Sequence, residues 1–342
     1  MSYQANWDNF MAVARGEQTD RVPVALIVDS PWIPGFMNMN MLDFFLFPDR
    51  WLAAHLHVIE RFPDLVLVPG FWVEYGMAAE PTAFGTPILW RQDAPPALRH
   101  LDLPPDQWAN LPRPDPQTDG MMPLVLRRLI DLEQKGGLPD PYRIHIVAAR
   151  GPLALATHVL GTTPFLEATA MEPEATQAVL DIFTDLVIAF LQAQLDCLRE
   201  PQGILLLDDI MGMLSPRAFK RIALPLLQRI FGAFDGLVKF YHNDTPCPHL
   251  LPHLSEAGFD VFNFSHTMDI GEVQAALGPQ IALMGNVAPL AVLVNSTPEQ
   301  VEADARACIE KTGGKGLILS AGGGASTGMP AAHVDALLRA VQ

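Results

Sequence analysis

The sequence predicts an α/β fold, specifically a (β/α)8 TIM barrel. Two patterns carry this prediction: short runs rich in Val, Ile and Leu, and longer segments with helical periodicity that follow each run. The two patterns alternate eight times along the 342 residues, as parallel strands joined by crossover helices do. The eight expected strands are 22–28, 64–68, 143–148, 204–207, 237–241, 260–264, 281–284 and 316–319.

A helix is expected after each of these strands. Most of the helical segments begin with proline, which the first turn tolerates because its missing N–H would be unpaired there anyway. The eight expected helices are 48–61, 123–135, 174–198, 216–234, 246–257, 270–277, 298–311 and 330–341.

Residues 70–120 fit the alternation poorly. A β-like run at 86–91 lies there among many prolines and polar residues. We therefore expect an insertion after the second strand, made of a hairpin and a long loop. Because no linker or low-complexity tract interrupts the remainder, residues 1–342 are expected to form a single barrel domain.

The charge balance of the chain limits the classes of partner that it can bind. With 22 basic and 38 acidic residues the net charge is −16, which repels phosphate backbones and anionic lipid. Nucleic-acid and membrane partners are therefore not expected. A hydrophobic content of 49% with 18% charged residues is sufficient for a sizeable core.

Cysteine usage and the N-terminal segment point to the cytoplasm. Cys197, Cys247 and Cys308 are far apart and odd in number, which does not suit a secreted disulfide framework. Residues 1–20 lack the basic start and apolar core of a signal peptide. The most apolar region, 178–198, is interrupted by Asp and Gln, so no membrane span is expected.

In a TIM barrel the catalytic groups come from loops at the C-terminal ends of the strands. Polar and aromatic side chains gather at these positions throughout the predicted barrel. In chain order they are Asp29; then Phe71, Trp72 and Glu74; Arg150; Asp208 and Asp209; His242 and Asp244; Asn263 and His266; Asn286; and the glycines 322–324, among them Gly323.

The segment after the fifth strand is the most informative. His242 and Asp244 are two residues apart, so both can project into the barrel mouth from one face of a strand. Imidazole and carboxylate together hold a metal, or work as an acid–base pair. A metal ligand set of His242, Asp244 and Cys247 is one hypothesis, although Cys247 falls in the expected following helix. The alternative is that these residues hydrogen-bond to neighbouring loops.

Asp208 and Asp209 follow four aliphatic residues, so one should face the mouth and the other the helical layer. A buried carboxylate at this point would have a raised pKa and could donate a proton. The alternative is that an aspartate caps the next loop or helix, because Asp is a preferred cap.

The other candidates each have a structural alternative. His266 either orients a ligand or closes its loop, and the glycines 322–324 either approach an anion or form a turn. Trp32, Phe71 and Trp72 either line an apolar substrate pocket or pack in the core.

At these residues the chain resembles the uroporphyrinogen decarboxylase superfamily, which includes corrinoid-dependent methyltransferases, over most of its length. Taken in order and spacing, the motifs indicate the superfamily, whose fold is a (β/α)8 barrel. They are Gly151–Gly161, Asp208-Asp209 with Leu214-Ser-Pro216, His242-x-Asp244, Met284-Gly-Asn286, and Leu319–Gly324 with Pro330.

One feature places the chain nearer the methyltransferase branch than the true decarboxylases, and a second separates it from the thiol-activating methyltransferases. The resemblance implies an arginine-rich segment after the first strand in true decarboxylases, whereas residues 22–49 here contain neither Arg nor Lys. A porphyrinogen would then keep several carboxylates desolvated without partners. The thiol-activating methyltransferases bind zinc through His-x-Cys and a distant Cys. This chain has Asp244 in place of the first Cys and Gly323 in place of the second, which disfavours zinc bound in that way.

The resemblance therefore implies a methyltransferase that moves a methyl group between a small methylated ether or amine, a corrinoid (cobalamin) on a partner protein, and tetrahydrofolate. The catalytic candidates are Asp209, His242 and Asp244, with Glu74 behind them. A homodimer is a family expectation. The alternatives are a decarboxylase for a less charged substrate, with Asp29 or Asp209 stabilising a cationic intermediate, and a non-catalytic ligand-binding barrel.

Overall fold

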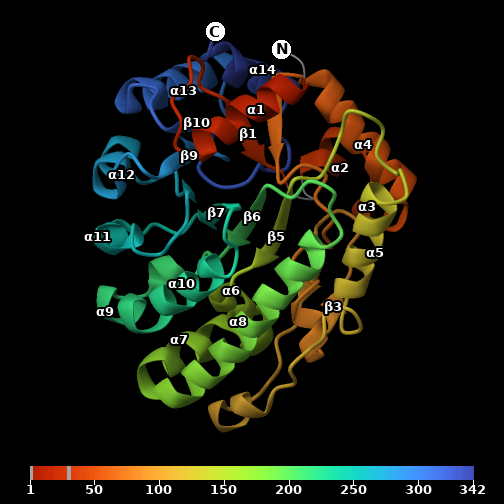
Figure 1. The fold of residues 1–342 in the computed structure, drawn as a ribbon, viewed down its shortest axis with the longest axis vertical. Coiled ribbons are helices and arrows are strands. Elements are labelled where there is room, and N and C mark those ends of the chain that lie inside the picture. Colours follow the sequence, from red (N-terminus) through yellow and green to blue (C-terminus); the bar gives the residue numbers. More distant parts are fainter. Residues whose placement is uncertain (1–2, 29–31) are drawn as a thin grey trace.

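The computed structural model describes residues 3–28 and 32–342. Eight parallel strands form one sheet in the order β2-β1-β10-β9-β8-β7-β6-β5, which curls into a nearly closed barrel surrounded by helices (Figure 1). All eight strands expected from the sequence are present, which confirms the TIM barrel. They are β1 (Val24–Ile27), β2 (Leu65–Val68), β5 (Ile146–Arg150), β6 (Gly203–Leu207), β7 (Val238–Asn243), β8 (Val261–Phe264), β9 (Ala282–Val287) and β10 (Leu317–Ala321).

Most of the expected helices are also confirmed. The bounds of α4 (Pro48–Arg61) and α12 (Ile270–Leu277) match the prediction at both ends. The others begin and end within three residues of it, and they are α5 (Met122–Glu133), α8 (Pro173–Leu195), α13 (Pro298–Thr312) and α14 (Ala331–Arg339).

Two expected helices are interrupted. The segment predicted as 216–234 is α9 (Pro216–Ala218), a π-helical turn η4 (Phe219–Ala223) and α10 (Leu224–Gly232). The segment predicted as 246–257 holds only a short 3-10 turn, η5 (Pro248–Leu250), and α11 (Leu251–Leu254). Prolines recur through this second segment, and each removes a backbone donor from the helical ladder.

Several short helices were not expected from the sequence. Two of them, α6 and α7, lie between β5 and α8, and α6 begins directly where β5 ends. The additional elements are α1 (Tyr3–Ala14), α2 (Trp32–Phe36), α3 (Met41–Leu46), α6 (Pro152–Leu160), α7 (Thr162–Met171), η1 (Pro81–Phe84), η2 (Pro105–Asn110) and η3 (Met211–Met213).

The segment between β2 and α5 contains a separate small sheet. Strands β3 (Ile88–Leu89) and β4 (Ala97–Leu98) pair antiparallel, with the 3-10 helices η1 and η2 on either side of them along the chain.

Helix α1 closes the N-terminal end of the barrel. Its Trp7 donates from Nε1 to Gln202, 3.0 Å away, just before β6, and the ring of Phe10 stacks on Phe240 of β7 with centroids 5.6 Å apart. The barrel interior is thereby filled from one end by apolar side chains. The open end is the one at which the strands finish, where TIM barrels place their active sites.

Helix α8 is long and apolar enough to cross a membrane by length and composition. However, 61% of its most apolar window is buried inside the protein, where the helix packs against β5, α6 and α7. This is the environment of a core helix. A helix that is apolar on all sides is found in the core of a large protein as well as in a membrane.

Candidate active site

Alternation along the strands decides which side chains enter the barrel. In β6, Leu205 and Leu207 belong to the interior cluster and Leu206 to the outer one, so Asp209 continues the inward row and Asp208 the outward row. By the same alternation, Phe240 of β7 precedes His242 on the inward row. The two-residue period therefore brings Asp209 and His242 to the mouth together.

His242 is buried and held from both sides. Its Nε2 lies 3.3 Å from Oδ1 of Asp209, and its Nδ1 lies 2.6 Å from Oδ1 of Asn263. The strand register produces this arrangement, because His242 pairs with Asn263 of β8 and with Leu207 of β6. The ring is thus fixed between a carboxylate and an amide.

Asn263 selects the tautomer of this histidine. Its Nδ2 donates to the carbonyl oxygens of Met284, at 2.7 Å, and Ala321, at 3.0 Å, so its Oδ1 must face His242. An oxygen acceptor at Nδ1 requires the proton to be there. The Nε2 atom is then left to accept or hold a proton beside Asp209.

The charges in the pair support each other. Burial alone would lower the pKa of His242, but the adjacent Asp209 carboxylate, with Asp244 and Asn263, raises that pKa above its ordinary value. Burial alone would raise the pKa of Asp209. The charge and hydrogen bond of His242, with the Asp244 N–H and the charge of Arg150, nevertheless lower the pKa of Asp209. An imidazolium–carboxylate pair is therefore favoured.

Asp244 completes the cluster from the loop after β7. Its backbone N–H donates to Oδ1 of Asp209 at 3.2 Å, and the next residue, Thr245, donates its hydroxyl to the carbonyl of Asp209. Burial and the like charge of Asp209 raise the pKa of Asp244, while His242 and His266 act in the opposite direction. Ligand atoms of Asp209, His242 and Asp244 all lie within 4.8 Å of one another.

Asp208 has a different environment. Its buried carboxylate accepts N–H groups of Leu153, at 3.3 Å, and Ala154, at 2.7 Å, which places it over the N-terminus of α6. Burial, only partly offset by these two bonds, raises the pKa of Asp208 to about 8. A Cβ at Gly151 would lie 2.4 Å from Oδ2 of Asp208, so the glycine is needed for the approach. The sequence left a substrate-facing acid and a helix cap open for this pair of aspartates, and in the structure Asp208 is the helix cap.

Gly323 and His266 lie near Asp244, and Asn286 supports the loop that carries His266. Gly323 has φ +131°, and a Cβ there would lie 3.6 Å from Cβ and Oδ2 of Asp244. The exposed His266 is close enough to lower the pKa of Asp244. Asn286 donates from Nδ2 to the carbonyl oxygens of Met268 and Ser265, at 2.7 and 3.3 Å, and so fixes the loop that carries His266.

Arg150 links the mouth to a second buried group. Its positive charge contributes to the lowered pKa of Asp209, and its guanidinium carbon lies 5.6 Å from the ring centroid of Trp72. Its backbone N–H donates to Glu80 at 2.8 Å. Trp72, Glu74, Glu80 and Arg150 line one narrow internal space, so Glu74 lies in this group and outside the three-residue cluster.

Two predicted aromatic residues are packing residues. Trp32 is fully buried, donates from Nε1 to the carbonyl of Met329 at 3.0 Å and packs against Phe36. Phe71 is equally buried, between His55 and Tyr142. Both therefore have the core environment that was the alternative to lining a substrate pocket. Asp29 lies outside the described residues.

Cys247 lies outside the cluster of candidate metal ligands. Its buried thiol accepts from Asn243 and contacts the sulfur of Met268, and burial raises its pKa to about 12. A thiol that keeps its proton is a poor ligand, because metals bind the thiolate. Asp209, which the sequence placed with the acid–base residues, occupies the third position beside His242 and Asp244.

Two residues near the site were not expected from the sequence. His158 is half-buried on α6; burial and Arg150 lower its pKa to about 4, while Asp209 acts in the opposite direction. Glu80 is buried, and burial raises its pKa despite the Arg150 N–H. Neither follows a barrel strand; His158 did fall within the Gly151–Gly161 motif, which was the one available signal.

Comparison with known proteins decides the family. The family model described as uroporphyrinogen decarboxylase (URO-D) matches residues 6–342. The chain belongs to the uroporphyrinogen decarboxylase family. The chain is 26% identical over 311 residues to uroporphyrinogen decarboxylase from Azotobacter vinelandii, covering 86% of this chain and 83% of the relative. It is 32% identical over 220 residues to the enzyme of that name from Nocardia farcinica, covering 62% and 59% of the two chains.

Solved structures of similar fold include a methyltransferase and a methionine synthase. A methyltransferase from Methanosarcina mazei superimposes with a TM-score of 0.84 at 19% identity, over 99% of this chain and 98% of the other. A B12-independent methionine synthase from Shewanella sp. W3-18-1 has a TM-score of 0.58 at 9% identity, over 93% and 97%. At these identities the likeness shows a shared fold. The chain is thus an enzyme of the uroporphyrinogen decarboxylase superfamily, and a methyltransferase is among the proteins that share its fold.

Proposed function

We propose that the protein transfers a methyl group between a small methylated ether or amine and a corrinoid on a separate protein, with tetrahydrofolate as a further acceptor. The observation that carries the proposal is the Asp209–His242–Asn263 chain of contacts at the barrel mouth, which holds a proton at a defined atom. The absence of Arg and Lys from residues 22–49 disfavours a substrate with many carboxylates.

His242 provides the proton that demethylation requires. When the C–O or C–N bond to the methyl group breaks, its electron pair stays on the oxygen or nitrogen, which needs a proton. The Nε2–H of charged His242 donates that proton, while Asp209 stabilises the imidazolium and Asn263 keeps the ring orientation. In the reverse direction, neutral Nε2 accepts the proton that the methyl acceptor loses.

Asp244 and Gly323 shape the space beside this proton. A glycine at position 323 leaves the side of Asp244 without a covering side chain, so a substrate amine or hydroxyl can approach its carboxylate. Asp244 therefore orients the polar atom of the substrate toward His242.

The same cluster suits a divalent cation in its donor set. His242 offers one imidazole nitrogen, and Asp209 and Asp244 offer carboxylate oxygens, all within 4.8 Å. A bound cation would polarise the leaving atom as a Lewis acid.

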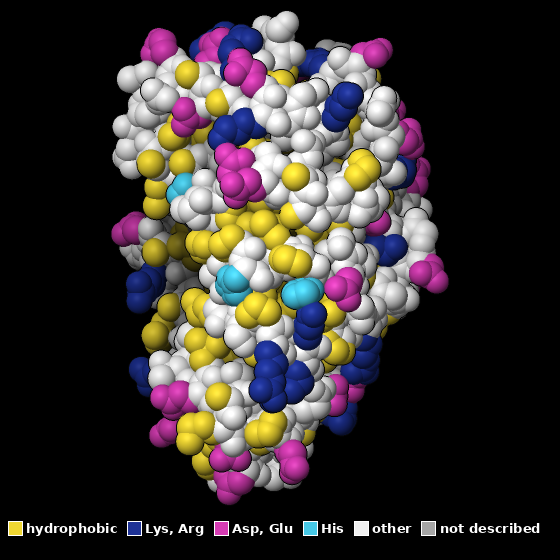
Figure 2. All heavy atoms as spheres, turned by 90° about the vertical axis from the view of Figure 1, so that its left-hand side faces the viewer, with side chains coloured by type: hydrophobic (Ala, Val, Ile, Leu, Met, Phe, Trp, Pro, Cys, Tyr) yellow, Lys and Arg dark blue, Asp and Glu magenta, His cyan; other side chains and the backbone are white. Residues whose placement is uncertain are grey.

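A basic hollow beside the mouth supports a partner with acidic groups. Arg217 and Arg221 line a hollow of about 460 Å³ with Met213 and Leu214, in the segment that follows Asp209, and none of its lining residues is acidic. Figure 2 faces the side of the molecule that carries α9, α11 and α12, and shows Lys and Arg side chains gathered below a band of hydrophobic ones. Against a net charge of −16, such a basic area would orient an acidic corrinoid protein.

The test mixes the protein with a reduced corrinoid protein and a panel of methyl ethers and methylamines. Formation of methylcobalamin, followed by its absorbance, is the expected result. Transfer in neither direction across the panel would reject the proposal.

A second candidate is decarboxylation of an acid less charged than a porphyrinogen. The curated relatives named as decarboxylases favour it, and Asp209, with 34% of its side chain exposed, could stabilise a cationic intermediate at the mouth. Release of labelled carbon dioxide from a small carboxylic acid, without methyl transfer, would support this candidate over the first.

A further inference from the structure

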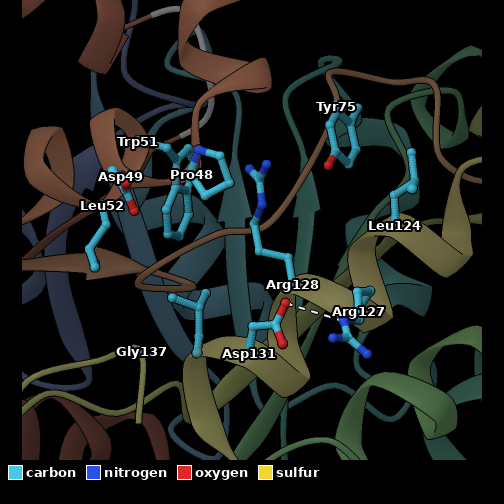
Figure 3. A pocket seen from close by; sticks show the side chains of 11 residues that line it. Pro48, Asp49, Trp51, Leu52, Tyr75, Leu124, Arg127, Arg128, Asp131 and Gly137 are labelled. Atoms are coloured by element: carbon cyan, nitrogen blue, oxygen red, sulfur yellow. Dashed lines mark hydrogen bonds and ion pairs between the residues drawn. The ribbon is translucent and has the colours of Figure 1, made fainter. Parts of the chain in front are cut away.

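A second pocket opens on the outside of the barrel, between the first turn of α4 and α5. Its volume of about 350 Å³ lies in the range of small-molecule sites. Figure 3 shows Pro48, Trp51 and Leu52 on one side of it, Tyr75 and Leu124 on the other, and Arg128 extending from α5 between them. The residues that line it are distinct from the Asp209–His242–Asp244 cluster.

Arg128 has few partners for a guanidinium in this position. Its Nη2 donates to the carbonyl of Phe45 at 3.0 Å, and its Nη1 is buried without a hydrogen-bond partner in the described chain. Among the described residues it makes no ion pair. Its guanidinium carbon lies 5.7 Å from the ring centroid of Trp51 and 5.5 Å from that of Tyr75. Arg128 lines the pocket with a positive charge that has no ionic partner among the described residues, and an anionic ligand would pair with this charge.

The other charges of the pocket do not neutralise Arg128. Asp131 is already paired, with Arg127 at 3.2 Å and Lys135 at 2.7 Å, and the first of these pairs is the dashed line in Figure 3. Asp49 is exposed on the first turn of α4. Arg128 is therefore the partly buried charge of the pocket that has no ionic partner among the described residues, and aromatic rings flank it on two sides.

We propose that this pocket binds a small anion, a carboxylate on a planar apolar body, with Arg128 pairing with the carboxylate and Trp51 and Tyr75 contacting the body. Arginine presents its N–H groups in a fork that matches a carboxylate. Tyr75 directly follows Glu74, which lines the internal space next to Arg150, so the ligand contacts the segment that leads to the barrel mouth.

The experiment uses the full chain and two matched probes, 1-naphthoate and its neutral amide 1-naphthamide, in calorimetric titrations. Naphthoate is expected to bind at least tenfold more tightly than the amide. Arg128→Met should weaken naphthoate by roughly 10- to 100-fold and leave the amide unchanged. Arg127→Met, next to it but already paired with Asp131, should change naphthoate affinity by less than about threefold.

Two further variants keep the outcome decisive if Arg128→Met folds poorly. Leu124→Trp, at an exposed edge of the pocket, should block both probes by filling it, whereas His242→Gln should leave both unaffected. Equal affinity for the two probes, or unchanged binding of naphthoate to Arg128→Met, would overturn the proposal. Loss of binding in His242→Gln alone would place the probe at the barrel mouth and overturn it equally.

Discussion

Nδ1 of His242 lies 2.6 Å from Oδ1 of Asn263, whose amide nitrogen is itself bound to two strand carbonyls. The amide cannot rotate without losing both carbonyl bonds, so it permits one tautomer of the neutral imidazole. The backbone of β9 and β10 thereby determines which histidine nitrogen faces Asp209.

Asn263→Leu should destabilise the protein by about 1–3 kcal/mol, because it leaves a buried Nδ1–H and two carbonyls unsatisfied. Asn263→Asp restores an acceptor for His242 and should raise the pKa of His242 further. Urea unfolding and NMR titration of the ring measure these effects. Asn295→Leu, which loses one exposed bond to the Leu290 carbonyl, is the control and should cost less than about 0.5 kcal/mol. Equal costs for the two leucine variants would contradict the assignment.

Asp209→Asn should lower the pKa of His242, because the carboxylate is the main group that raises it against burial. In the wild type the pair stabilises the folded state below the ordinary histidine pKa of 6.5, and this contribution is lost as pH rises through the raised pKa. NMR titration of the His242 ring in both proteins is the measurement. An unchanged pKa in the variant would show that Asp209 does not control this proton.

Asp208→Ala should cost about 1–2 kcal/mol, because it removes the cap of α6. Asp208→Asn keeps an acceptor and should cost less. The pKa of Asp208 rises from 3.8 to about 8 on folding, so wild-type stability falls as pH increases across that window. The difference between Asp208→Asn and wild type should therefore shift in favour of the variant between about pH 4 and about pH 8. A difference independent of pH in urea unfolding would rule out the raised pKa.

Zinc affinity should depend on His242 and Asp244 and be insensitive to Cys247. A proton competes with the metal for Nε2 of His242, so affinity should fall about tenfold per pH unit below the pKa of this residue. Calorimetric titration of chelator-treated protein tests the site. His242→Gln and Asp244→Asn should each weaken binding, whereas Cys247→Ser should not. The opposite pattern would restore the thiol as a ligand.

The barrel itself was predictable from local pattern. Alternation of apolar runs and helical periodicity located all eight strands, because each is buried on both faces and rich in aliphatic residues. The bounds of the helix predicted at 246–257 were wrong, because a chain of prolines supports turns there more readily than a long helix. Helices α6 and α7 were missed, because they precede α8 within a crossover expected to hold one helix.

Only the site residues that directly follow a strand could be predicted from the sequence. The two-residue period showed that Asp208 and Asp209 face opposite ways, but deciding which one enters the mouth requires knowing which leucines of β6 face the barrel interior. The capping of α6 by Asp208 also depends on a contact between sequentially distant segments, with Gly151 leaving room for it. Glu80 belongs to the insertion and His158 to helix α6, so a search restricted to the ends of strands does not find them.

The pH dependence of methyl transfer with chelator present, measured for wild type and His242→Gln on the same donor, tests the central claim most directly. The account predicts a rate that falls as pH rises through the raised pKa of His242, and a loss of about 100- to 10,000-fold in the variant. A His242→Gln protein that transfers methyl groups at the wild-type rate across the pH range would contradict it.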